Sequence, residues 1–362
     1  MAIWKIDELG EFVTLKRGYD LPQQKRKNGE IPIFSSSGVT GTHNEAMVEA
    51  PGVITGRYGT IGEVFFAETS FWPLNTTLYV ENFHENDEKF VYYFLKTLEW
   101  KKFASASAVP GINRNTVHKE IVRFPDFETQ QKIASVLSTI DKKIAVNKAI
   151  NDNLEQQAAA LFSSLYNRSN TEVRYTDLIQ LLGGGTPKTG ETAYWNGNIA
   201  FFTPKDVGTP YTFITEKTIT EEGLSHCNSR LYPVNTVFVT ARGTVGKVGL
   251  SGIPMAMNQS CYALVGKETH QLLVYFYTLK AVDRLKHKAS GAVFDAITTR
   301  DFDSEQIMKL SDDDAKAFLC VAEPMFQEML NNSIENLRLS TLRDFLLPKL
   351  MSGEIDVSSV QL

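Results

Sequence analysis

The sequence predicts an α+β protein with two related globular domains, each followed by a long helix, and with the two helices paired as an antiparallel coiled coil. Three observations support this fold. Apolar residues recur at every third and fourth position through residues 133–165, which is the pattern of one long helix that packs along a seam. The same pattern returns 185 residues later. The globular segments also repeat short motifs in the same order, which indicates a duplicated unit with pseudo-twofold symmetry.

Length and composition agree with this organisation. The chain has 362 residues, of which 43% are hydrophobic and 22% charged, as expected for two or three globular domains. We expect a first domain at 1–127, a first helix at 128–168, a second domain at 169–311, a second helix at 312–352 and a tail at 353–362. Because no apolar run is long enough to span a bilayer, we expect a cytoplasmic protein with no membrane partner.

The predicted seam carries two asparagines in each helix. In the first helix its positions are Ile133, Leu137, Ile140, Ile144, Asn147, Asn151 and Leu154. Adding 185 to such positions gives, in the second helix, Phe318, Met325, Met329, Asn332, Asn336 and Leu339. A buried asparagine destabilises a seam unless it finds a partner, and it commonly fixes the register. Matching asparagine pairs therefore indicate that the helices pack on each other, and about 33 helical residues span roughly 50 Å.

The first domain is predicted from short apolar runs separated by turn residues. Residues 25–29 form a basic turn and 35–38 a second turn, both marked by glycine with serine or asparagine. Strands are expected at 53–55 and 63–66, joined by a glycine-spaced hairpin. A helix is expected at 88–103 from its apolar spacing.

The second domain repeats these parts. Strands at 237–240 and 247–250 flank a hairpin that matches the first one at an offset of 184 residues. Residues 257–262 match 74–79 at an offset of 183, 291–293 match 107–109 at 184, and Ile297 matches Ile112 at 185. Small changes of offset are what loop insertions and deletions produce in a duplicated unit.

This arrangement resembles the DNA-specificity subunit of a type I restriction-modification system, and the resemblance covers nearly the whole chain. It is carried by the duplication together with local motifs, which are Gly183-Gly184-Gly185-Thr186-Pro187, Tyr194-Trp195, Thr203-Pro204-Lys205-Asp206, the hairpins at 57–62 and 242–246, and residues 346–355. Two features depart from the family pattern. The first domain has Arg17-Gly18-Tyr19 in place of the glycine run, and Pro324 is expected to disturb the start of the second helix.

The resemblance implies a non-catalytic subunit. Each domain would be a target-recognition domain that reads one half of a bipartite double-stranded DNA target, and the helices would set the unread gap. Two readers on one face of a duplex lie about one helical turn apart, roughly 34 Å. The resemblance also implies two methyltransferase subunits docked on the helices, with restriction and translocase subunits outside them. S-adenosylmethionine, ATP and Mg would then be bound by the partners, and this chain would hold no cofactor or metal.

The charge distribution restricts how such a chain binds DNA. The formal net charge is −5, which argues against indiscriminate binding to phosphates. The acidic excess lies in residues 312–362, where nine acidic residues outnumber four basic ones. DNA contacts must therefore come from local basic patches, and the acidic last helix offers a surface for partners.

The candidate DNA-binding residues are cations in turns, loops and helix ends, namely Lys25, Arg26, Lys27, Arg57, Arg114, Lys188, Lys205, Arg242, Lys286, Lys288 and Arg300. Arg57 and Arg242 sit in glycine-rich turns, where a guanidinium can reach guanine O6 and N7 or a phosphate. They align one residue out of register, which weakens the case for a shared role. The alternative is that each arginine pairs with a nearby carboxylate and holds the hairpin in shape.

Structural alternatives also stay open for the other candidates. Residues 25–27 could be ordinary solvated surface, and the basic end of the helix at 284–288 could serve the helix dipole. Arg114 and Arg300 follow the duplicated segments, next to residues that suit base edges. Asn115 and Thr299 could equally be helix caps.

No catalytic constellation is predicted. The three cysteines, Cys227, Cys261 and Cys320, have no metal or disulfide spacing, and we expect buried thiols. The histidines lack metal spacing, and nucleotide-binding and hydrolase motifs are missing. Two competing functions stay open at this point, a scaffold whose domains bind protein and an enzyme with an unrecognised site.

Overall fold

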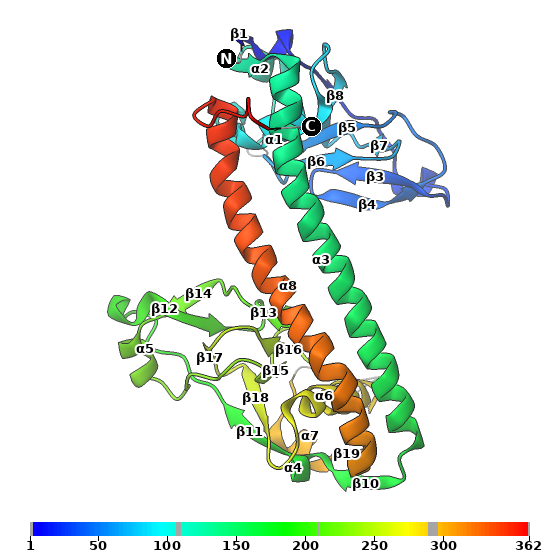
Figure 1. The fold of residues 1–362 in the computed structure, drawn as a ribbon, viewed down its shortest axis with the longest axis vertical. Coiled ribbons are helices and arrows are strands. Elements are labelled where there is room, and N and C mark those ends of the chain that lie inside the picture. Colours follow the sequence, from blue (N-terminus) through cyan, green and yellow to red (C-terminus); the bar gives the residue numbers. More distant parts are fainter. Residues whose placement is uncertain (1–2, 106–109, 209, 289–295, 361–362) are drawn as a thin grey trace. The chain divides into compact units, whose positions relative to one another are not determined.

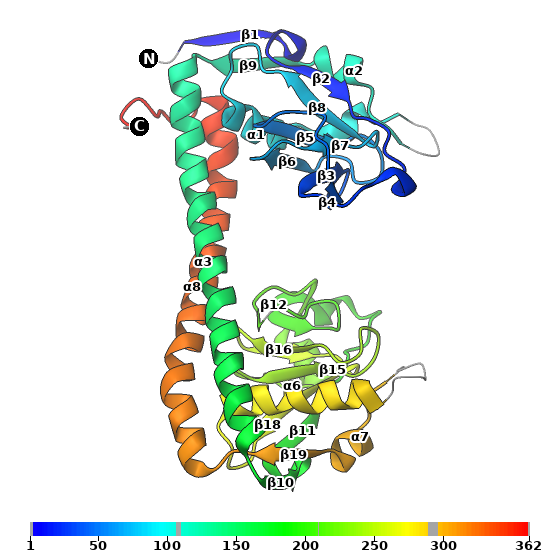
Figure 2. The same ribbon diagram turned by 90° about the vertical axis from the view of Figure 1, so that its right-hand side faces the viewer.

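The computed structural model describes residues 3–105, 110–208, 210–288 and 296–360. The chain forms two compact units, unit 1 with Met1–Ala145 and Asn336–Leu362, and unit 2 with Val146–Glu335 (Figures 1 and 2). Two long helices, α3 (Phe127–Arg168) and α8 (Asp312–Ser352), each contribute one half to each unit.

The globular domain of unit 1 is built from short strands with a helix against them. Its strands are β1 (Trp4–Glu8), β2 (Thr14–Arg17), β3 (Ile31–Ser35), β4 (Gly38–His43), β5 (Gly52–Gly56), β6 (Val64–Ala67), β7 (Trp72–Pro73), β8 (Thr77–Asn82) and β9 (Ile121–Pro125). Its helices are α1 (Glu88–Thr97) and α2 (Arg114–His118), with 3-10 turns at Leu9–Glu11, Gln23–Lys25 and Trp100–Phe103. The strands form sheets in the orders β2-β8-β5-β6, β4-β3-β7 and β1-β9.

The globular domain of unit 2 follows the same plan. Its strands are β10 (Thr171–Arg174), β11 (Ile179–Gly183), β12 (Trp195–Phe202), β13 (Tyr211–Thr212), β14 (Lys217–Ile219), β15 (Val237–Thr240), β16 (Val248–Ser251), β17 (Met255–Met257), β18 (Cys261–Gly266) and β19 (Gln306–Lys309). Its helices are α4 (Tyr175–Leu178), α5 (Glu221–Ser225), α6 (Gln271–Lys288) and α7 (Thr299–Ser304), with a 3-10 turn at Thr192–Tyr194. The sheet orders are β11-β18-β15-β16-β13, β14-β12-β17 and β10-β19.

Each core lies between a sheet and a helix. In unit 1, α1 packs on β5 and β6 and buries Phe90 and Val91 completely. In unit 2, α6 lies along β15, β16 and β18, as Figure 2 shows, and buries Val274 and Ala281 completely. Burial of a large apolar side chain contributes roughly 1.5–3 kcal/mol, so these helices fix the sheets and thereby the loops at their edges.

Both predicted hairpins are confirmed. β5 pairs antiparallel with β6, and β15 pairs antiparallel with β16. The turns between these strands contain Gly59 and Gly62 in unit 1, and Gly243 and Gly246 in unit 2, all at positive φ between 74° and 95°. Such φ values favour glycine, which explains the glycine spacing of the sequence. The turn predicted at residues 35–38 is also confirmed, since it joins β3 to β4.

The helix predicted at 88–103 is shorter than expected. α1 ends at Thr97, Leu98 is extended, and a separate 3-10 turn covers Trp100–Phe103. The indole Nε1 of Trp100 donates to the carbonyl of Leu95 at 2.8 Å. A continuing helix would pair that carbonyl with the N–H of residue 99, so the buried indole replaces the helical partner and the helix stops.

Within each unit the long helices pair antiparallel, as predicted. In unit 2, contacts join Arg168 to Asp314 and Asn151 to Asn332. In unit 1, a contact joins Asp141 to Arg343. In unit 2 the later residue of α3 therefore meets the earlier residue of α8, which defines the antiparallel direction. In unit 1 the two helices also run in opposite directions (Figure 1).

The predicted seam is largely buried. The buried members are Ile133, Leu137, Ile140, Ile144, Asn147, Phe318, Met329 and Asn332. The half-buried members are Asn151, Leu154, Met325, Asn336 and Leu339. Near the end of α3 the seam rule puts Leu161 inside, but Phe162 is buried and Leu161 only partly so. The ring of Phe162 packs on Phe276 of the domain, so the domain contact decides which residue faces inward.

The expectation that Pro324 disturbs α8 is wrong, because the helix continues across it. Proline lacks the N–H that would pair with the carbonyl of Cys320. Cys320 and Pro324 are both exposed, so that carbonyl lies where water can hydrate it. The predicted tail after α8 also packs, since Val357 is buried in the unit 1 core and Lys132 Nζ donates to the carbonyl of Ser358 at 3.3 Å.

The duplication keeps a constant register through the paired strands. β5 pairs Ile54 with Tyr79, and β15 pairs Phe238 with Ala263. Phe238 and Ala263 each lie 184 positions after their counterparts Ile54 and Tyr79. Residues 74–79 therefore correspond to residues 258–263, and the offset of 183 predicted from the sequence is wrong by one residue. The match of 107–109 with 291–293 lies outside the described residues.

Candidate nucleic-acid interface

The turn after the central strand has the same backbone in both domains. In unit 1 the carbonyl of Thr76 accepts from the backbone N–H groups of Arg57 at 2.8 Å and Tyr58 at 3.2 Å. In unit 2 the carbonyl of Ser260 accepts from Ala241 at 2.8 Å and Arg242 at 3.2 Å. Arg57 therefore corresponds to Ala241, and Tyr58 corresponds to Arg242. The two arginines therefore occupy adjacent, non-equivalent positions, as the hairpin offset of 184 residues predicts.

Arg57 and Arg114 meet at one recess of about 590 Å³ in unit 1. Arg57 Nε donates to the carbonyl of Ile112 at 3.3 Å, and its guanidinium lies 4.5 Å from the ring centroid of Tyr58. Arg57 thus braces the hairpin through a carbonyl and an aromatic ring, whereas the sequence alternative proposed a carboxylate. Arg114 is exposed at the start of α2, on the rim of the same recess.

Two cations of this recess were missed from the sequence. Lys16 and Arg17, on β2, line it together with Arg57 and Arg114. They reach the recess because β2 pairs with β8, which pairs with β5 at the base of the hairpin. The signal that could have found them is Arg17-Gly18, which corresponds to Gly183-Gly184 of the second domain. Gly18 and Gly184 both lie against backbone carbonyls of the segment that leads into the neighbouring strand, where a Cβ would be 2.2 Å from Leu74 O or Asn258 O.

Helix caps precede both Arg114 and Arg300. The Asn113 side chain accepts from the N–H of Asn115 at 3.0 Å, and Thr298 forms a capping box with Asp301. Both helices are therefore capped, but the capping residues are Asn113, two positions before the Asn115 suggested by the sequence, and Thr298, one position before the suggested Thr299. The arginines extend from the first helical turns, and both are exposed.

Two cations of the second domain gather at its hairpin. Arg242 is exposed and its backbone bridges to Ala296, just before α7. Lys286 of α6 lies against the same hairpin, since a Cβ on Gly246 would be 2.5 Å from Lys286 Cε. The structure thus brings Lys286 to the turn that carries Arg242.

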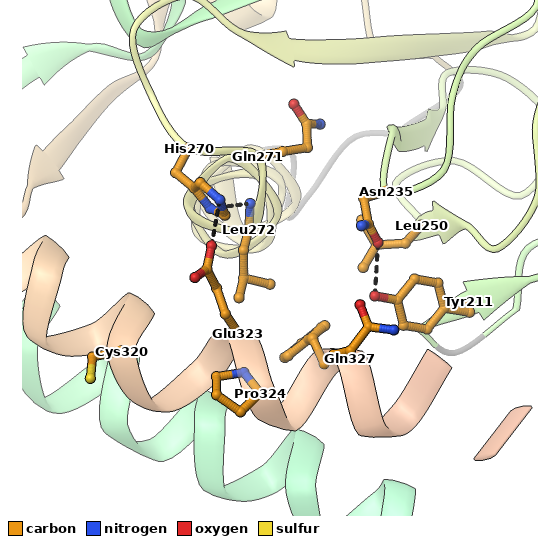
Figure 3. Close-up of a pocket in the computed structure, with 11 residues that line it drawn as sticks. Tyr211, Asn235, Leu250, His270, Gln271, Leu272, Cys320, Glu323, Pro324 and Gln327 are labelled. Carbon is orange, nitrogen blue, oxygen red and sulfur yellow. Dashed lines mark hydrogen bonds and ion pairs between the residues drawn. The ribbon is translucent and has the colours of Figure 1, made fainter. Parts of the chain in front are cut away.

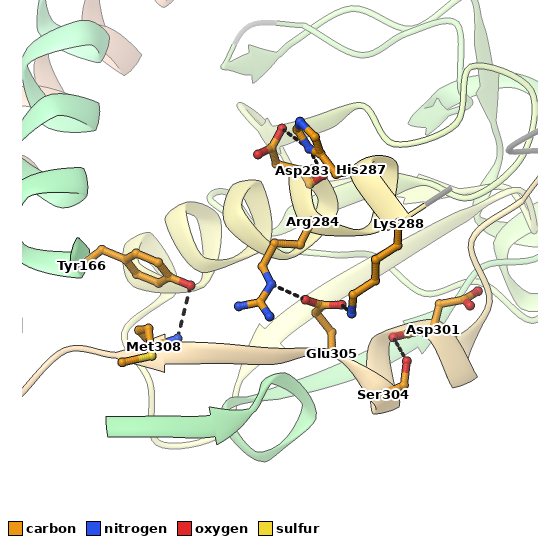
Figure 4. A network of polar contacts seen from close by, with 9 residues as sticks. All are labelled: Tyr166, Asp283, Arg284, His287, Lys288, Asp301, Ser304, Glu305 and Met308. Carbon is orange, nitrogen blue, oxygen red and sulfur yellow. Dashed lines mark hydrogen bonds and ion pairs between the residues drawn. The ribbon is translucent and has the colours of Figure 1, made fainter. Parts of the chain in front are cut away.

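Lys288 is held by a carboxylate (Figure 4). Glu305 is completely buried, with Oε2 2.5 Å from Lys288 Nζ and Oε1 2.7 Å from Arg284 Nε. The Arg284 contact is an ion pair without good hydrogen-bond alignment. A buried carboxylate requires such partners, so the geometry favours a structural role for Lys288 over a DNA contact.

The remaining candidates lie on separate loops. Lys25 and Lys27 are exposed, while Arg26 is half-buried with Nη1 3.4 Å from the carbonyl of Thr40. Lys188 is exposed, and its carbonyl accepts from Trp195 Nε1. Lys205 forms an exposed pair with Glu216 at 3.4 Å, which contributes about 0–1 kcal/mol. These residues stay predictions as DNA contacts.

A second recess, of about 460 Å³, lies in unit 2 between the domain and α8 (Figure 3). His270 Nε2 is 2.6 Å from Glu323 Oε1, and the Tyr211 hydroxyl donates to Asn235 Oδ1 at 2.9 Å. Burial raises the pKa of Tyr211, so its hydroxyl is a neutral donor. The His270–Glu323 contact joins the domain to α8, whereas the Tyr211–Asn235 bond lies within the domain.

The cysteines are free. Cys261 is buried, and burial raises the pKa of its thiol to about 12. The expectation of buried thiols is wrong for Cys320, which is exposed because it lies on the opposite face of α8 from Phe318 and Ala322. Within the described ranges, no cluster of His, Cys, Asp or Glu could hold a metal ion. Among the described helices, none has the length and apolarity to cross a membrane.

The two duplicated hairpins have the same backbone hydrogen bonds but carry different cations. Loops of each domain converge around its hairpin. These features define a modular nucleic-acid recognition protein. Comparison with known proteins gives the family. A family model described as the type I restriction modification DNA specificity domain matches residues 1–156 and 167–309, and the chain belongs to this family. It is a DNA-recognition subunit of the type I restriction-modification class.

Individual relatives agree. The HindI specificity subunit of Haemophilus influenzae is 25% identical, over 72% of this chain and 75% of the relative. The EcoR124I/EcoR124II specificity subunit of Escherichia coli is 28% identical, over 52% of this chain and 50% of the relative. The crystal structure of the S subunit from M. genitalium has the same fold, with a TM-score of 0.66 at 17% identity over 96% of both chains.

Proposed function

We propose that each domain reads one half of a bipartite double-stranded DNA target and that α3 and α8 set the unread gap between the halves. The observation that carries this proposal is that the two hairpins share a backbone conformation but present different side chains. The residues after the central strand make the same backbone hydrogen bonds in both hairpins, yet Arg57 and Tyr58 correspond to Ala241 and Arg242. Base edges are distinguished by side chains, so two such domains suit two different half-sequences.

The helices also suit docking of methyltransferase subunits. Val146 and Ile150, four residues apart on α3, are 53% and 41% exposed. Leu342 and Phe345, three apart on α8, are 45% and 58% exposed. Residues at these spacings share one helix face, and exposed apolar pairs on a helix are typical of partner surfaces. We propose two methyltransferase subunits on these faces and restriction and translocase subunits outside them.

The chemistry belongs to the partners in this proposal. S-adenosylmethionine, ATP and Mg bind to the methyltransferase and translocase subunits, and this chain contributes recognition and spacing. The complex works in the cytoplasm, where it meets the chromosome. Methyl transfer by purified components tests this division, because the chain alone should be inactive and the methyltransferase subunit should gain activity and site selection when the chain is added.

The target sequence of the complex can be determined by mapping the methylated bases of a host genome. A host without other methyltransferases, carrying this chain and its methyltransferase subunit, should show modified adenines in one split motif with a fixed gap. A continuous motif without a gap, or methylation unrelated to sequence, would contradict the proposed function.

A further inference from the structure

The recess at the first hairpin gathers four cations. Lys16, Arg17, Arg57 and Arg114 all line the cavity of about 590 Å³. Lys16 pairs with Glu81 and Arg17 with Asp20. Subtracting these two carboxylates from the four cations leaves two positive charges around one cavity. Like charges held together repel, so such a cluster favours a bound anion.

The equivalent positions of the second domain are uncharged. In the register of the sheets, Lys16 and Arg17 of β2 lie opposite Tyr79 and Leu78 of β8. In the second domain, Leu182 and Gly183 of β11 lie opposite Ala263 and Tyr262 of β18. With the offset of 184 along these strands, Lys16 corresponds to Leu182 and Arg17 to Gly183.

The two arginines are replaced in the same way. Arg57 corresponds to Ala241 through the shared hairpin hydrogen bonds. Arg114 and Thr299 each follow a capping residue, Asn113 and Thr298. All four cations of the first domain are thus absent from the matching positions of the second. The second domain has an arginine one residue after each of these positions, since Arg242 follows Ala241 and Arg300 follows Thr299.

We propose that this recess is a binding site for a DNA backbone phosphate, present in the first domain and replaced by neutral residues in the second. The proposal rests on the proposed function, because it assigns one part of the DNA interface. A phosphate fits the site better than a base edge does. Arg57 is already held by the Ile112 carbonyl and the Tyr58 ring, so it acts as a fixed charge. The two positive charges that remain around the cavity match the full negative charge of a phosphate.

Arg114 is the residue to test, because it is exposed and starts a helix without bracing the hairpin. The assembled complex with R114Q should bind DNA more weakly on its own target and on scrambled duplex alike. The slope of log Kd against log[KCl] should fall in magnitude by about 0.9, the value for one phosphate contact. R114K should keep the slope, since a phosphate needs charge and no forked geometry.

The matched control is T299Q, at the equivalent position of the second domain, which should leave the slope unchanged. A second variant, R17Q, should lower the slope in the same direction as R114Q, and thermal melting checks that each variant folds. The proposal is overturned if R114Q keeps the wild-type slope, or if it weakens binding only to the target and R114K fails to restore it. If the wild-type complex does not prefer its methylated motif, the proposed function fails, while the slope on scrambled DNA still decides the phosphate site.

Discussion

Asn332 Nδ2 donates to Asn151 Oδ1 at 3.0 Å between α8 and α3 of unit 2. Asn151 Nδ2 in turn lies 3.2 Å from the Met329 carbonyl and 3.2 Å from Ser333 Oγ. The sequence matched Asn147 to Asn332 and Asn151 to Asn336 through the duplication, whereas in the antiparallel pair Asn151 contacts Asn332. Because a shift of one residue would separate these groups, the pair holds the helices in one register.

Breaking this pair should destabilise unit 2. N332A leaves the Asn151 carbonyl oxygen without its donor in a half-buried seam, and we expect the free energy of unfolding to fall by about 1–3 kcal/mol. The double variant N151L/N332L should lose less than the sum of the single variants N151L and N332L, because it removes both polar partners together. Urea titrations of the four proteins of the cycle measure the coupling. N153A, on the exposed face of α3, is the control, and additive losses would show that the pair is not coupled.

A second polar cluster joins the first domain to both long helices in unit 1. The Tyr93 hydroxyl donates to Asp141 Oδ2 at 2.6 Å, and Arg343 Nη1 donates to Asp141 Oδ1 at 2.8 Å. Burial, with the Asp141 carboxylate beside it, raises the pKa of Tyr93. Y93F should lower the free energy of unfolding by about 1.5–3 kcal/mol, as expected for a hydrogen bond to a charged group. Y92F changes the adjacent, less buried tyrosine and should have an effect below about 0.5 kcal/mol; equal effects would argue against the cluster.

Stability should depend on pH through His118. Its Nε2 accepts from the Leu15 N–H at 2.8 Å and thereby ties α2 to β2. Burial, followed by the charge of Arg114, lowers the pKa of His118 below its usual 6.5. The unfolded chain therefore binds the proton first, and stability is lost as pH falls below about 6.5. The melting temperature should drop between pH 7 and pH 5.5, and H118Q should flatten this dependence. An unchanged slope in H118Q would assign the effect to other groups.

Neighbouring lysines at the end of α6 should have separate roles. K288Q removes a partner of the buried Glu305 carboxylate, so the melting temperature should fall while the salt dependence of DNA binding stays as in the wild type. K286Q changes an exposed lysine beside the second hairpin and should reduce the salt slope while the melting temperature stays within about 2 °C. If K288Q instead reduced the salt slope and K286Q lowered the melting temperature, Lys288 would be the DNA contact.

Lengthening both helices should lengthen the gap in the target. One heptad inserted in α3 after Ala145 and one in α8 after Glu335 adds about 10 Å of helix, or about three base pairs of duplex. The inserted residues should repeat the seam pattern so that both helices extend together. Methylation sequencing should then show the same half-sequences with a longer gap. An unchanged gap would exclude the helices as the spacer.

Much of this fold could be predicted from the sequence because the helical periodicity and the internal duplication extend over many residues. The seam through Ile133, Asn151 and Asn332 depends on helical periodicity and on the duplication, and both survive in the structure. The failures are local. Phe162 faces inward in place of Leu161 because of its contact with Phe276, and Trp100 ends α1 through a side-chain hydrogen bond. Neither contact leaves a periodic signal.

The candidate interface was predicted less well than the fold. Arg57 and Arg114 were found because they follow duplicated motifs. Lys16 and Arg17 were missed because only the pairing of β2 with β8 brings them to the recess. Arg57 and Arg242 lie one residue out of register in the sequence, and the hydrogen bonds of the two hairpins confirm that they are not equivalent. Lys288 was chosen for its charge, and its buried partner Glu305 is distant in sequence.

Exchange of one domain tests the central claim most directly. Residues 169–311 should be replaced by the second domain of another specificity subunit with a different target, and the methylated motif of the host should be sequenced. Independent half-site readers predict that one half of the motif changes, while the other half and the gap are retained. A motif that changes in both halves, or stays the same, would contradict the account.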